Sequence, residues 1–271
     1  MPLRPLDVFY QCLQNQTAVD RFIRRKRDLV LVDFDEEYTF ALACDSNASI
    51  GRKPNDYVQV DWKEVGRWAS KVPLMEVLAC GALPFVVVDN LCVEMEPAGN
   101  EILAGIRYEV ERLGLNPDLV ITGSAEKNMP TSQTGLGVTV LGMARRNEIK
   151  TGCSQSGDFI VCVGLPKSNP EVPFREGDPD VMDPPATRKL AGYPAIHDII
   201  PVGSHGVRYE MKILAEESDH QVEEIPSAVD MTQSAGPSTC VLASLKEEEI
   251  PALRRWMTQP VNPVGILKKI G

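Results

Sequence analysis

The spacing of apolar positions along the chain predicts alternating helices and strands. Apolar residues recur at helical intervals over three segments of the first half, Leu6–Arg24, Lys63–Cys80 and Asn100–Leu113. Gly81 and Gly114 directly follow the second and third segments, where glycine commonly ends a helix. Asn100 is placed to cap the third helix at its amino end. We therefore expect one long amphipathic helix at the amino terminus and two further helices in the first half.

Apolar and β-branched runs predict strands in both halves of the chain. The first half contains Tyr38–Cys44, Phe85–Val88, Asp118–Thr122 and Val138–Ala144, and the second half Asp158–Leu165, Ile196–Val202, Thr239–Leu245 and Val264–Ile270. Helical patterns at Val207–Glu217 and Lys246–Met257 lie among the later strands. Because strands and helices do not alternate strictly, the sequence predicts an α+β protein. A polar seam at Arg145–Ser156 divides it into two domains, residues 1–150 and 151–271.

Composition excludes several classes of protein. The 271 residues are 43% hydrophobic and 24% charged, as in ordinary globular proteins. A net charge of −10 argues against nucleic acid as a main partner, since phosphate backbones are bound by clustered Lys and Arg. The one basic run, Arg24–Arg27, is either a solvated face or a phosphate contact. No segment has the length of a membrane span, and the amino terminus lacks the apolar core of a signal peptide.

The cysteines favour a reducing compartment. Their number is odd, seven, and no CxxC pair occurs, so we expect small buried side chains instead of disulfides or a zinc site. Together with the absence of a membrane span or signal peptide, these features predict a cytoplasmic protein.

Acidic residues at the ends of predicted strands suggest a metal site. Asp45 and Asp89 follow strands, and Glu126 lies in the long polar loop Gly123–Gly135. Carboxylates gathered at one edge of a sheet would repel one another unless they shared a cation, and hard oxygen ligands suit magnesium. The alternative is that each acid caps a turn or pairs with a nearby lysine. The residues alone leave both interpretations open.

Two glycine-containing loops are candidates for binding phosphate. The first loop offers backbone amides and the side chains of Ser124, Thr131, Thr134 and Lys127, without the GxxxxGK[ST] pattern of a P-loop. The second, Gly203-Ser204-His205-Gly206, leads from a strand into a helix, whose amino end can bind an anion. His205 is the one histidine placed to contact a substrate. The proline-rich Lys167–Ala186 stretch is either a lid or a surface excursion.

Several motifs, in order along most of the chain, resemble the aminoimidazole ribonucleotide (AIR) synthetase-like superfamily. They are Asp45-Ser46-Asn47-Ala48-Ser49-Ile50-Gly51, the Ala79-Cys80-Gly81-Ala82-Leu83-Pro84 helix end, the Gly123-Ser124-Ala125-Glu126 loop, the Gly157–Gly164 strand and the Gly203–Gly206 turn. The resemblance implies a homodimer whose amino-terminal sheets pair, with ATP and magnesium in a cleft beside that interface. It implies an ATP-dependent enzyme acting on a small molecule.

The resemblance also implies roles for individual positions. Asp45, Asp89 and Glu126 would be metal ligands or their support, and Asp45 and Lys53 would serve catalysis. Nucleotide contacts would come from nine positions: Asn47, Gly123, Ser124, Asn128, Thr131, Thr134, Gly203, Ser204 and Gly206.

Departures from the family's patterns narrow the choice among its members. No Gly-rich segment with a reactive cysteine precedes the first strand, which disfavours selenophosphate synthesis. The chain does not end in cysteine, unlike the hydrogenase-maturation protein, and Asp33-Phe34-Asp35 only loosely matches the Asp-Asp of thiamine-monophosphate kinase. The Asp-Ser-Asn motif and compact length are closest to α-ribazole kinase. A synthetase-type activity, a thiamine-monophosphate kinase-like activity and a non-catalytic nucleotide-binding homodimer are the alternatives, and the acceptor is not determined by the sequence.

Overall fold

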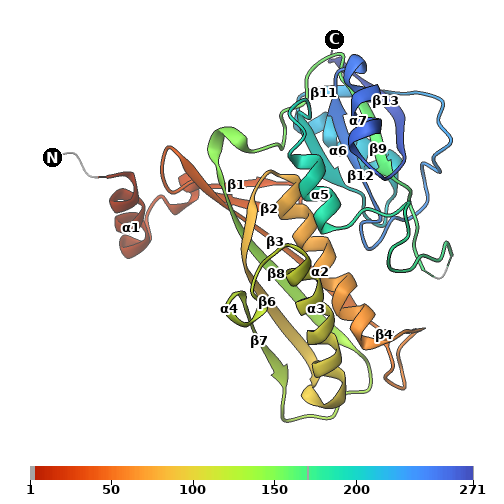
Figure 1. Ribbon diagram of the computed structural model, residues 1–271. Helices are drawn as coiled ribbons and strands as arrows, with labels where there is room; N and C mark the ends of the chain where they lie inside the picture. Colours follow the sequence, from red (N-terminus) through yellow and green to blue (C-terminus); the bar gives the residue numbers. More distant parts are fainter. Residues whose placement is uncertain (1–3, 170, 271) are drawn as a thin grey trace.

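A computed structural model describes residues 4–169 and 171–270, which form two main β-sheets and a small parallel pair (Figure 1). The first sheet contains, in spatial order, β1 (Ile23–Lys26), β2 (Leu29–Val32), β3 (Tyr38–Ala48), β8 (Gly135–Arg145), β6 (Leu83–Glu94) and β7 (Ile121–Glu126). Its neighbours are antiparallel except for β6 and β7, which run parallel. The expected mixture of helices and strands is thereby confirmed.

Two helices, α2 (Trp62–Ala79) and α3 (Asn100–Arg112), cover one face of this sheet. Alternate residues of β3, namely Thr39, Ala41 and Ala43, point toward them and are buried. The other face carries no helix of the described chain (Figure 1). There Phe40, Met143 and Leu83 lie in one row across β3, β8 and β6, and the latter two side chains are 41% and 56% exposed. One face of this sheet is therefore covered by helices, whereas the other face is uncovered and carries exposed apolar side chains.

The second sheet is covered on both faces. Its order is β10 (Asp198–Pro201), β12 (Cys240–Leu245), β9 (Phe159–Gly164), β13 (Val261–Lys269) and β11 (His220–Glu224). One apolar cluster includes α5 (Pro184–Ala191) and α7 (Ile250–Trp256), and another includes α6 (Val207–Glu217). Met75 and Ala79 of α2 belong to the first of these clusters, so α2 packs against both sheets.

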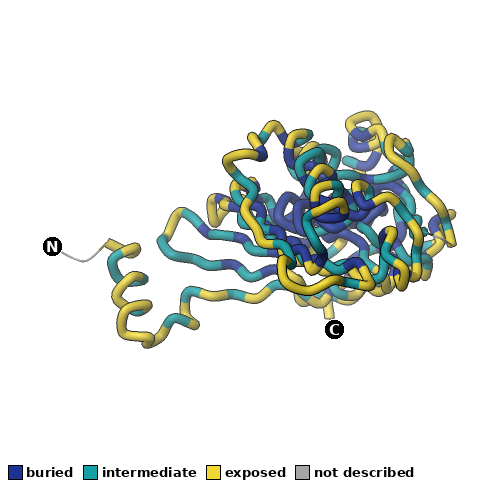
Figure 2. Tube along the Cα trace, turned by 90° about the horizontal axis from the view of Figure 1, so that it is seen from below, coloured by how far each residue is buried: buried dark blue, intermediate teal, exposed yellow. Residues whose placement is uncertain are grey.

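Shorter elements complete the described chain. They are α1 (Pro5–Asn15), the turns η1 (Val19–Phe22), η2 (Met95–Gly99), η3 (Arg146–Glu148) and η4 (Glu247–Glu249), the parallel pair β4 (Ile50–Gly51) and β5 (Val58–Gln59), and α4 (Pro117–Val120). Helix α1 contains no buried residue and extends away from the body (Figures 1 and 2).

The expected amino-terminal helix over Leu6–Arg24 is wrong beyond Asn15. Gln16 and Ala18 adopt left-handed backbone conformations, with φ of 50° and 51°, which interrupts the helix. The chain then forms η1 and the first strand, so the basic run Arg24–Arg27 lies in β1 and its turn instead of at a helix end. The helical periodicity correctly located α1, but the predicted helix extended nine residues too far.

Other differences are local. The expected strand Asp118–Thr122 begins with a helical turn, because Pro117 starts α4 and the Asn116 side chain accepts a hydrogen bond from Asp118 N. Helix α6 matches its prediction, and Gly81 and Gly114 have the positive φ of helix-ending glycines. Cys80, Cys162 and Cys240 are buried as expected, whereas the other cysteines are wholly or partly exposed.

Within the described residues, no helix is long and apolar enough to cross a membrane.

Candidate active site

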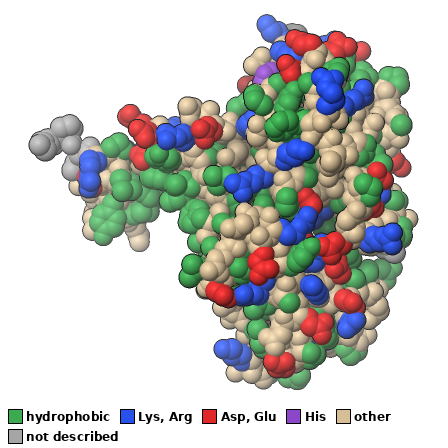
Figure 3. Space-filling view, viewed as in Figure 1, with side chains coloured by type: hydrophobic (Ala, Val, Ile, Leu, Met, Phe, Trp, Pro, Cys, Tyr) green, Lys and Arg blue, Asp and Glu red, His purple; other side chains and the backbone are tan. Residues whose placement is uncertain are grey.

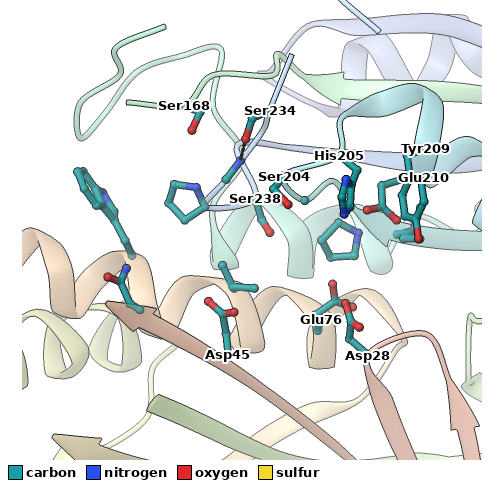
Figure 4. Close-up of a pocket in the computed structure, with 18 of the residues that line it drawn as sticks. Asp28, Asp45, Glu76, Ser168, Ser204, His205, Tyr209, Glu210, Ser234 and Ser238 are labelled. Carbon is teal, nitrogen blue, oxygen red and sulfur yellow. Dashed lines mark hydrogen bonds between the residues drawn. The ribbon is translucent and has the colours of Figure 1, made fainter. Parts of the chain in front are cut away.

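A cavity of about 790 Å³, here called the central cavity, lies between α2 and the loops of the second sheet (Figure 4). Its floor is formed by the β1–β2 turn, β3 and α2. Its roof is formed by loop residues near positions 168, 201–205 and 234–238 together with α6. The size is within the usual range for a site that binds a nucleotide or another small molecule.

The turn between β1 and β2 delivers Asp28 to the floor. A two-residue hairpin needs left-handed backbone, and Arg27 provides it with φ of 52°. The Arg27 side chain is buried and donates to Ile199 O (2.9 Å) and Thr151 Oγ1 (2.9 Å). It also forms an ion pair with Glu217 (3.3 Å). These contacts fix the hairpin tip against the second sheet and so position Asp28.

Asp45 and Glu76 complete an acidic floor with Asp28. Asp45 extends from β3 and Glu76 from α2, and Figure 4 shows both facing the same hollow as Asp28. Burial raises the pKa of Asp45, and the charge of Asp28 raises it further. Burial raises the pKa of Glu76 to about 8; Arg27 opposes this shift, while Asp28 adds to it. The charge of Asp28 raises the pKa of both Asp45 and Glu76, so these acids repel one another when ionised, and a bound cation would relieve that repulsion.

Two oxygens on the floor lack a hydrogen-bond partner among the described residues. They are Glu76 Oε2 and Asn47 Oδ1, both of which are buried atoms of residues that line the central cavity. An unsatisfied buried oxygen costs free energy unless a ligand, water or ion completes it. The donor set of carboxylates and one amide oxygen fits magnesium, which prefers hard oxygen ligands.

The roof presents hydroxyl and aromatic groups and a single acid, Glu210. Ser204 and Ser238 face the floor, and His205 packs against Tyr209 with ring centroids 4.7 Å apart (Figure 4). Gly206 has φ of 78°, and a Cβ there would lie 2.9 Å from Thr232 C, so this position is restricted to glycine. Gly203 and Ser204 line the cavity as the turn before α6, whereas Gly206 serves the geometry of the turn.

Glu210 is the acid of the roof. It lies one turn into α6, and burial raises its pKa to about 7, although a hydrogen bond from the Gly203 backbone acts in the opposite direction. The cavity therefore has acids on opposing walls.

The structure does not gather Asp45, Asp89 and Glu126 into one site. Asp45 and Asp89 both pair with Val138, two strands apart and therefore about 10 Å between Cα atoms, and Val138 is fully buried between them. Glu126 instead accepts backbone hydrogen bonds from Asn128 (2.6 Å) and Met129 (3.1 Å). Across residues 4–169 and 171–270, no group of three or more His, Cys, Asp or Glu side chains is arranged to hold a metal ion.

A second cavity of about 510 Å³, here called the edge cavity, is lined by Asp89 and part of the polar loop. Gly123, Ser124 and Lys127 line it with Asp89. Burial raises the pKa of Asp89 to about 6. A Cβ on Gly123 would lie 2.2 Å from Asp89 Oδ1, so glycine is required for this carboxylate to occupy its place. The predicted residues Asp89, Gly123 and Ser124 thus lie together, but away from Asp45.

The remaining polar residues of the loop bond within the fold. Lys53 forms an ion pair with Glu94, which also accepts from Thr131 N (2.8 Å) and Thr131 Oγ1 (2.7 Å). These hydrogen bonds lower the pKa of Glu94 to about 2, with Lys53 as the largest cause. Lys53 and Thr131 were both predicted to contact phosphate, but in the structure both contact the carboxylate of Glu94.

Thr134 and Asn128 are also held by the fold. Thr134 is buried, donates from Oγ1 to Asp56 (2.7 Å) and accepts from Trp62 Nε1 (3.0 Å). The backbone of Asn128 caps Glu126. These residues organise the loop in the present conformation.

Sequence patterns did not single out Asp28, Glu76 and Glu210. Asp28 directly precedes the apolar run Leu29-Val30-Leu31-Val32. This run is a strand signal, but it lies just after the end of the predicted helix and was not used. Glu76 is an acid on the otherwise apolar side of α2, and such a residue is a recognisable exception within a buried helix face. Glu210 gave no signal beyond its place in the first turn of α6.

Most of the first sheet matches the model of a described family. Residues 26–144 match the family model "AIR synthase related protein, N-terminal domain". No protein with a curated description matches the sequence.

Solved structures with the same fold cover most of the chain. Thiamine-monophosphate kinase from Stenotrophomonas maltophilia is 14% identical with a TM-score of 0.63, over 97% of this chain and 93% of that one. Hydrogenase maturation protein HypE in complex with ATP is 14% identical with a TM-score of 0.60, over 85% and 77%. T. maritima PurL complexed with FGAR is 14% identical with a TM-score of 0.63, over 88% of this chain but 43% of that one.

The class of protein follows from these observations. The chain has the AIR synthetase-like fold, and its residues 26–144 match that family's amino-terminal domain.

Proposed function

We propose that this protein is an ATP- and magnesium-dependent enzyme that phosphorylates or activates a small molecule in the central cavity. The observation that carries the proposal is the acidic floor: Glu76 and Asn47 line a cavity large enough for a nucleotide, and Glu76 Oε2 and Asn47 Oδ1 have no hydrogen-bond partner among the described residues. The neighbours described as complexes with ATP, or with AMPPCP and TMP, share the fold and support this choice of ligand.

The absence of an all-protein cage is compatible with magnesium. This ion commonly uses one or two carboxylates and completes its shell with phosphate oxygens and water. Asp28 and Asp45 would hold it, with Glu76 and Asn47 as oxygen donors beside them. When bound, magnesium neutralises charge on the transferred phosphate. Asp89 and Glu126 would join this site only after a rearrangement, because the structure places them elsewhere.

The chain's own residues suit the positioning of a phosphate and an acceptor. Ser204, at the turn before α6, would orient phosphate oxygens together with backbone amides. Glu210, whose pKa is raised to about 7 by burial, is suited to accept a proton from an acceptor hydroxyl near neutral pH. Closing water out of the cavity would strengthen each of these interactions.

Among acceptors, α-ribazole is the first to test, since the Asp45-Ser46-Asn47 motif and compact chain favour it. Thiamine monophosphate and a formylglycinamidine-type substrate represent the thiamine-monophosphate kinase and synthetase alternatives. ATP consumption should be measured with each acceptor, with magnesium present and with it chelated. Turnover only with magnesium and one acceptor would support the proposal. ATP binding without turnover on any acceptor would favour the non-catalytic nucleotide-binding protein, and no binding of ATP would contradict both.

The open face of the first sheet supports a homodimer as part of this proposal. Phe40 and Phe85 lie 5.9 Å apart there, beside the row of Met143 and Leu83. Figure 3 shows hydrophobic side chains on α1 and along the adjacent edge of the body. Contiguous exposed apolar surface commonly marks an interface. Light scattering should give twice the chain mass, and Phe85→Glu should give a monomer; a wild-type monomer would contradict the dimer.

A further inference from the structure

A third hollow, here called the side cavity, lies next to the central cavity. It has a volume of about 330 Å³ and is lined by α2, α3, residues 174–183 and residues 258–259. Trp68 and Phe174 line both cavities, and their rings lie 5.7 Å apart. This aromatic pair therefore forms a wall common to both cavities.

The acids around the side cavity already have cationic partners. Arg67 pairs with Glu64 (3.0 Å), Glu109 (2.9 Å) and Glu176 (2.8 Å). Arg112 pairs with Glu109 (3.0 Å) and with Asp183, and Lys167 pairs with Asp178 (2.8 Å). Each carboxylate of the lining thus accepts at least one charge-assisted contact.

Lys71 is different. It is 6% exposed and lines the side cavity, yet it forms no hydrogen bond or ion pair with the described residues. Its amine lies 5.7 Å from the centre of the Phe174 ring, a cation–π contact that provides no hydrogen-bond acceptor. The ammonium of a largely buried lysine is normally hydrogen-bonded, and here the described residues provide no acceptor, so the amine is open to a ligand in the side cavity.

Burial lowers the pKa of Lys71 to about 8. Asp183, before α5, and Glu109 of α3 oppose this shift, as does Cys240 of β12, whereas Arg67 of α2 adds to it. The nearby acids are bound to the arginines and leave the amine only partly compensated. Arg175 is a second cation of the lining without an ion pair in the described chain.

We propose that the side cavity binds a phosphate-type anion, with Lys71 as its principal ligand and Arg175 as a second cation. A phosphate oxygen is a strong acceptor and would provide the charge-assisted partner that the ammonium lacks. The anion is either free phosphate or the phosphate group of a longer molecule that extends from the central cavity past Trp68 and Phe174 into the side cavity. This proposal does not depend on catalysis in the central cavity.

Titration of the full chain with inorganic phosphate tests the site directly. We expect saturable binding by calorimetry at pH 7, at least about 10-fold weaker in Lys71→Met. The affinity should fall as the pH rises through about 8, because Lys71 loses its proton there. Lys63→Met is the matched control, since Lys63 lies on the same helix but is exposed, and it should bind like the wild type.

A second measurement reports on Lys71 itself. Amine acylation followed by mass spectrometry at pH 8 should label Lys71, and phosphate should suppress that labelling without protecting Lys63. Phosphate affinity equal to wild type in Lys71→Met, or unchanged labelling of Lys71 at saturating phosphate, would overturn the proposal.

Competition distinguishes the two sources of phosphate. If ADP with magnesium displaces phosphate, the group belongs to a longer ligand that reaches from the central cavity. If both bind together, the site takes a free anion. Either result supports the site, because Lys71→Met should weaken phosphate binding in both cases.

Discussion

The polar segment Gly123–Gly135, which the structure divides into the end of β7 and the loop before β8, has polar residue types similar to those of the central cavity but uses them differently. In the loop, Thr134, Thr131 and Glu126 are hydrogen-bonded within the protein. On the cavity floor, Glu76 Oε2 and Asn47 Oδ1 have no partner in the described chain. Polar composition therefore marks a candidate site only when its groups are not already needed by the fold.

The cavity also differs from the loop in how it is built. The loop is local in sequence, although residues such as Asp56, Trp62 and Glu94 contact it from elsewhere. The cavity brings together the turn at Asp28, strand β3, helix α2 and the second sheet. Substitutions in the two regions should therefore separate activity from stability.

The largest effect is expected for Asp45→Asn. Loss of this carboxylate should reduce kcat by at least about 100-fold, because the charge that holds magnesium at the phosphate is removed. Asparagine has nearly the same shape, so the melting temperature should stay close to that of the wild type. Steady-state ATP turnover and thermal unfolding measure the two effects. The matched loop variant Asn128→Ala should retain most activity, because its backbone, not its side chain, caps Glu126; full activity in Asp45→Asn would remove this residue from the site.

Thr134→Val should show the opposite behaviour. Valine fills the space but leaves Asp56 and Trp62 without their hydroxyl partner in a buried position, which costs about 2 to 3 kcal/mol. Denaturant unfolding should show this loss, while the Kd for ATP in the folded protein is unchanged. Thr131→Val, at a more exposed position, is the control and should be milder. A large loss of ATP affinity with unchanged stability would instead return Thr134 to the nucleotide site.

Glu76→Gln should change the pH dependence of stability. Burial raises the folded-state pKa of Glu76 to about 8, well above the ordinary value of a glutamate, so the folded protein holds a proton that the unfolded chain releases between these values. The free energy of unfolding should therefore fall as the pH rises through this window. The glutamine variant lacks that loss, so its stability relative to wild type should rise by about 3 kcal/mol from pH 5 to pH 8.

Urea unfolding without added metal measures this difference. Adding magnesium should flatten the pH dependence of the wild type, because the ion favours the charged carboxylate, and should leave the variant little changed. If the free energy of unfolding of the two proteins changed with pH in the same way, Glu76 would be ionised in the folded protein without loss of stability, which would contradict the prediction.

The sequence predicted the fold better than the site. The family resemblance and the periodicity of α2, α3 and α6 were sufficient for the architecture, because long amphipathic patterns depend on local spacing. Asp45, Asn47, Gly203 and Ser204 were predicted and do line the central cavity, although their roles are still proposals. Asp28 was missed because the predicted helix overlapped the start of β1 and neither β1 nor β2 was predicted as a strand, so the hairpin that positions Asp28 was not expected. No local pattern could show that Thr134 bonds to Asp56, since that contact joins residues 78 positions apart.

Lys53→Met is expected to have the smallest effect on activity and stability. It tests most directly whether the loop and the central cavity act separately. Lys53 pairs with Glu94 in the loop, so its ammonium is already engaged and does not line the central cavity. We expect activity within about threefold of wild type and only a small change in melting temperature, as is usual for an ion pair near the surface. Kinetics at saturating and limiting ATP would detect either a loss of kcat or a rise in KM. A loss of kcat as large as that of Asp45→Asn would mean that Lys53 leaves Glu94 during turnover, and the loop would then belong to the active site after all.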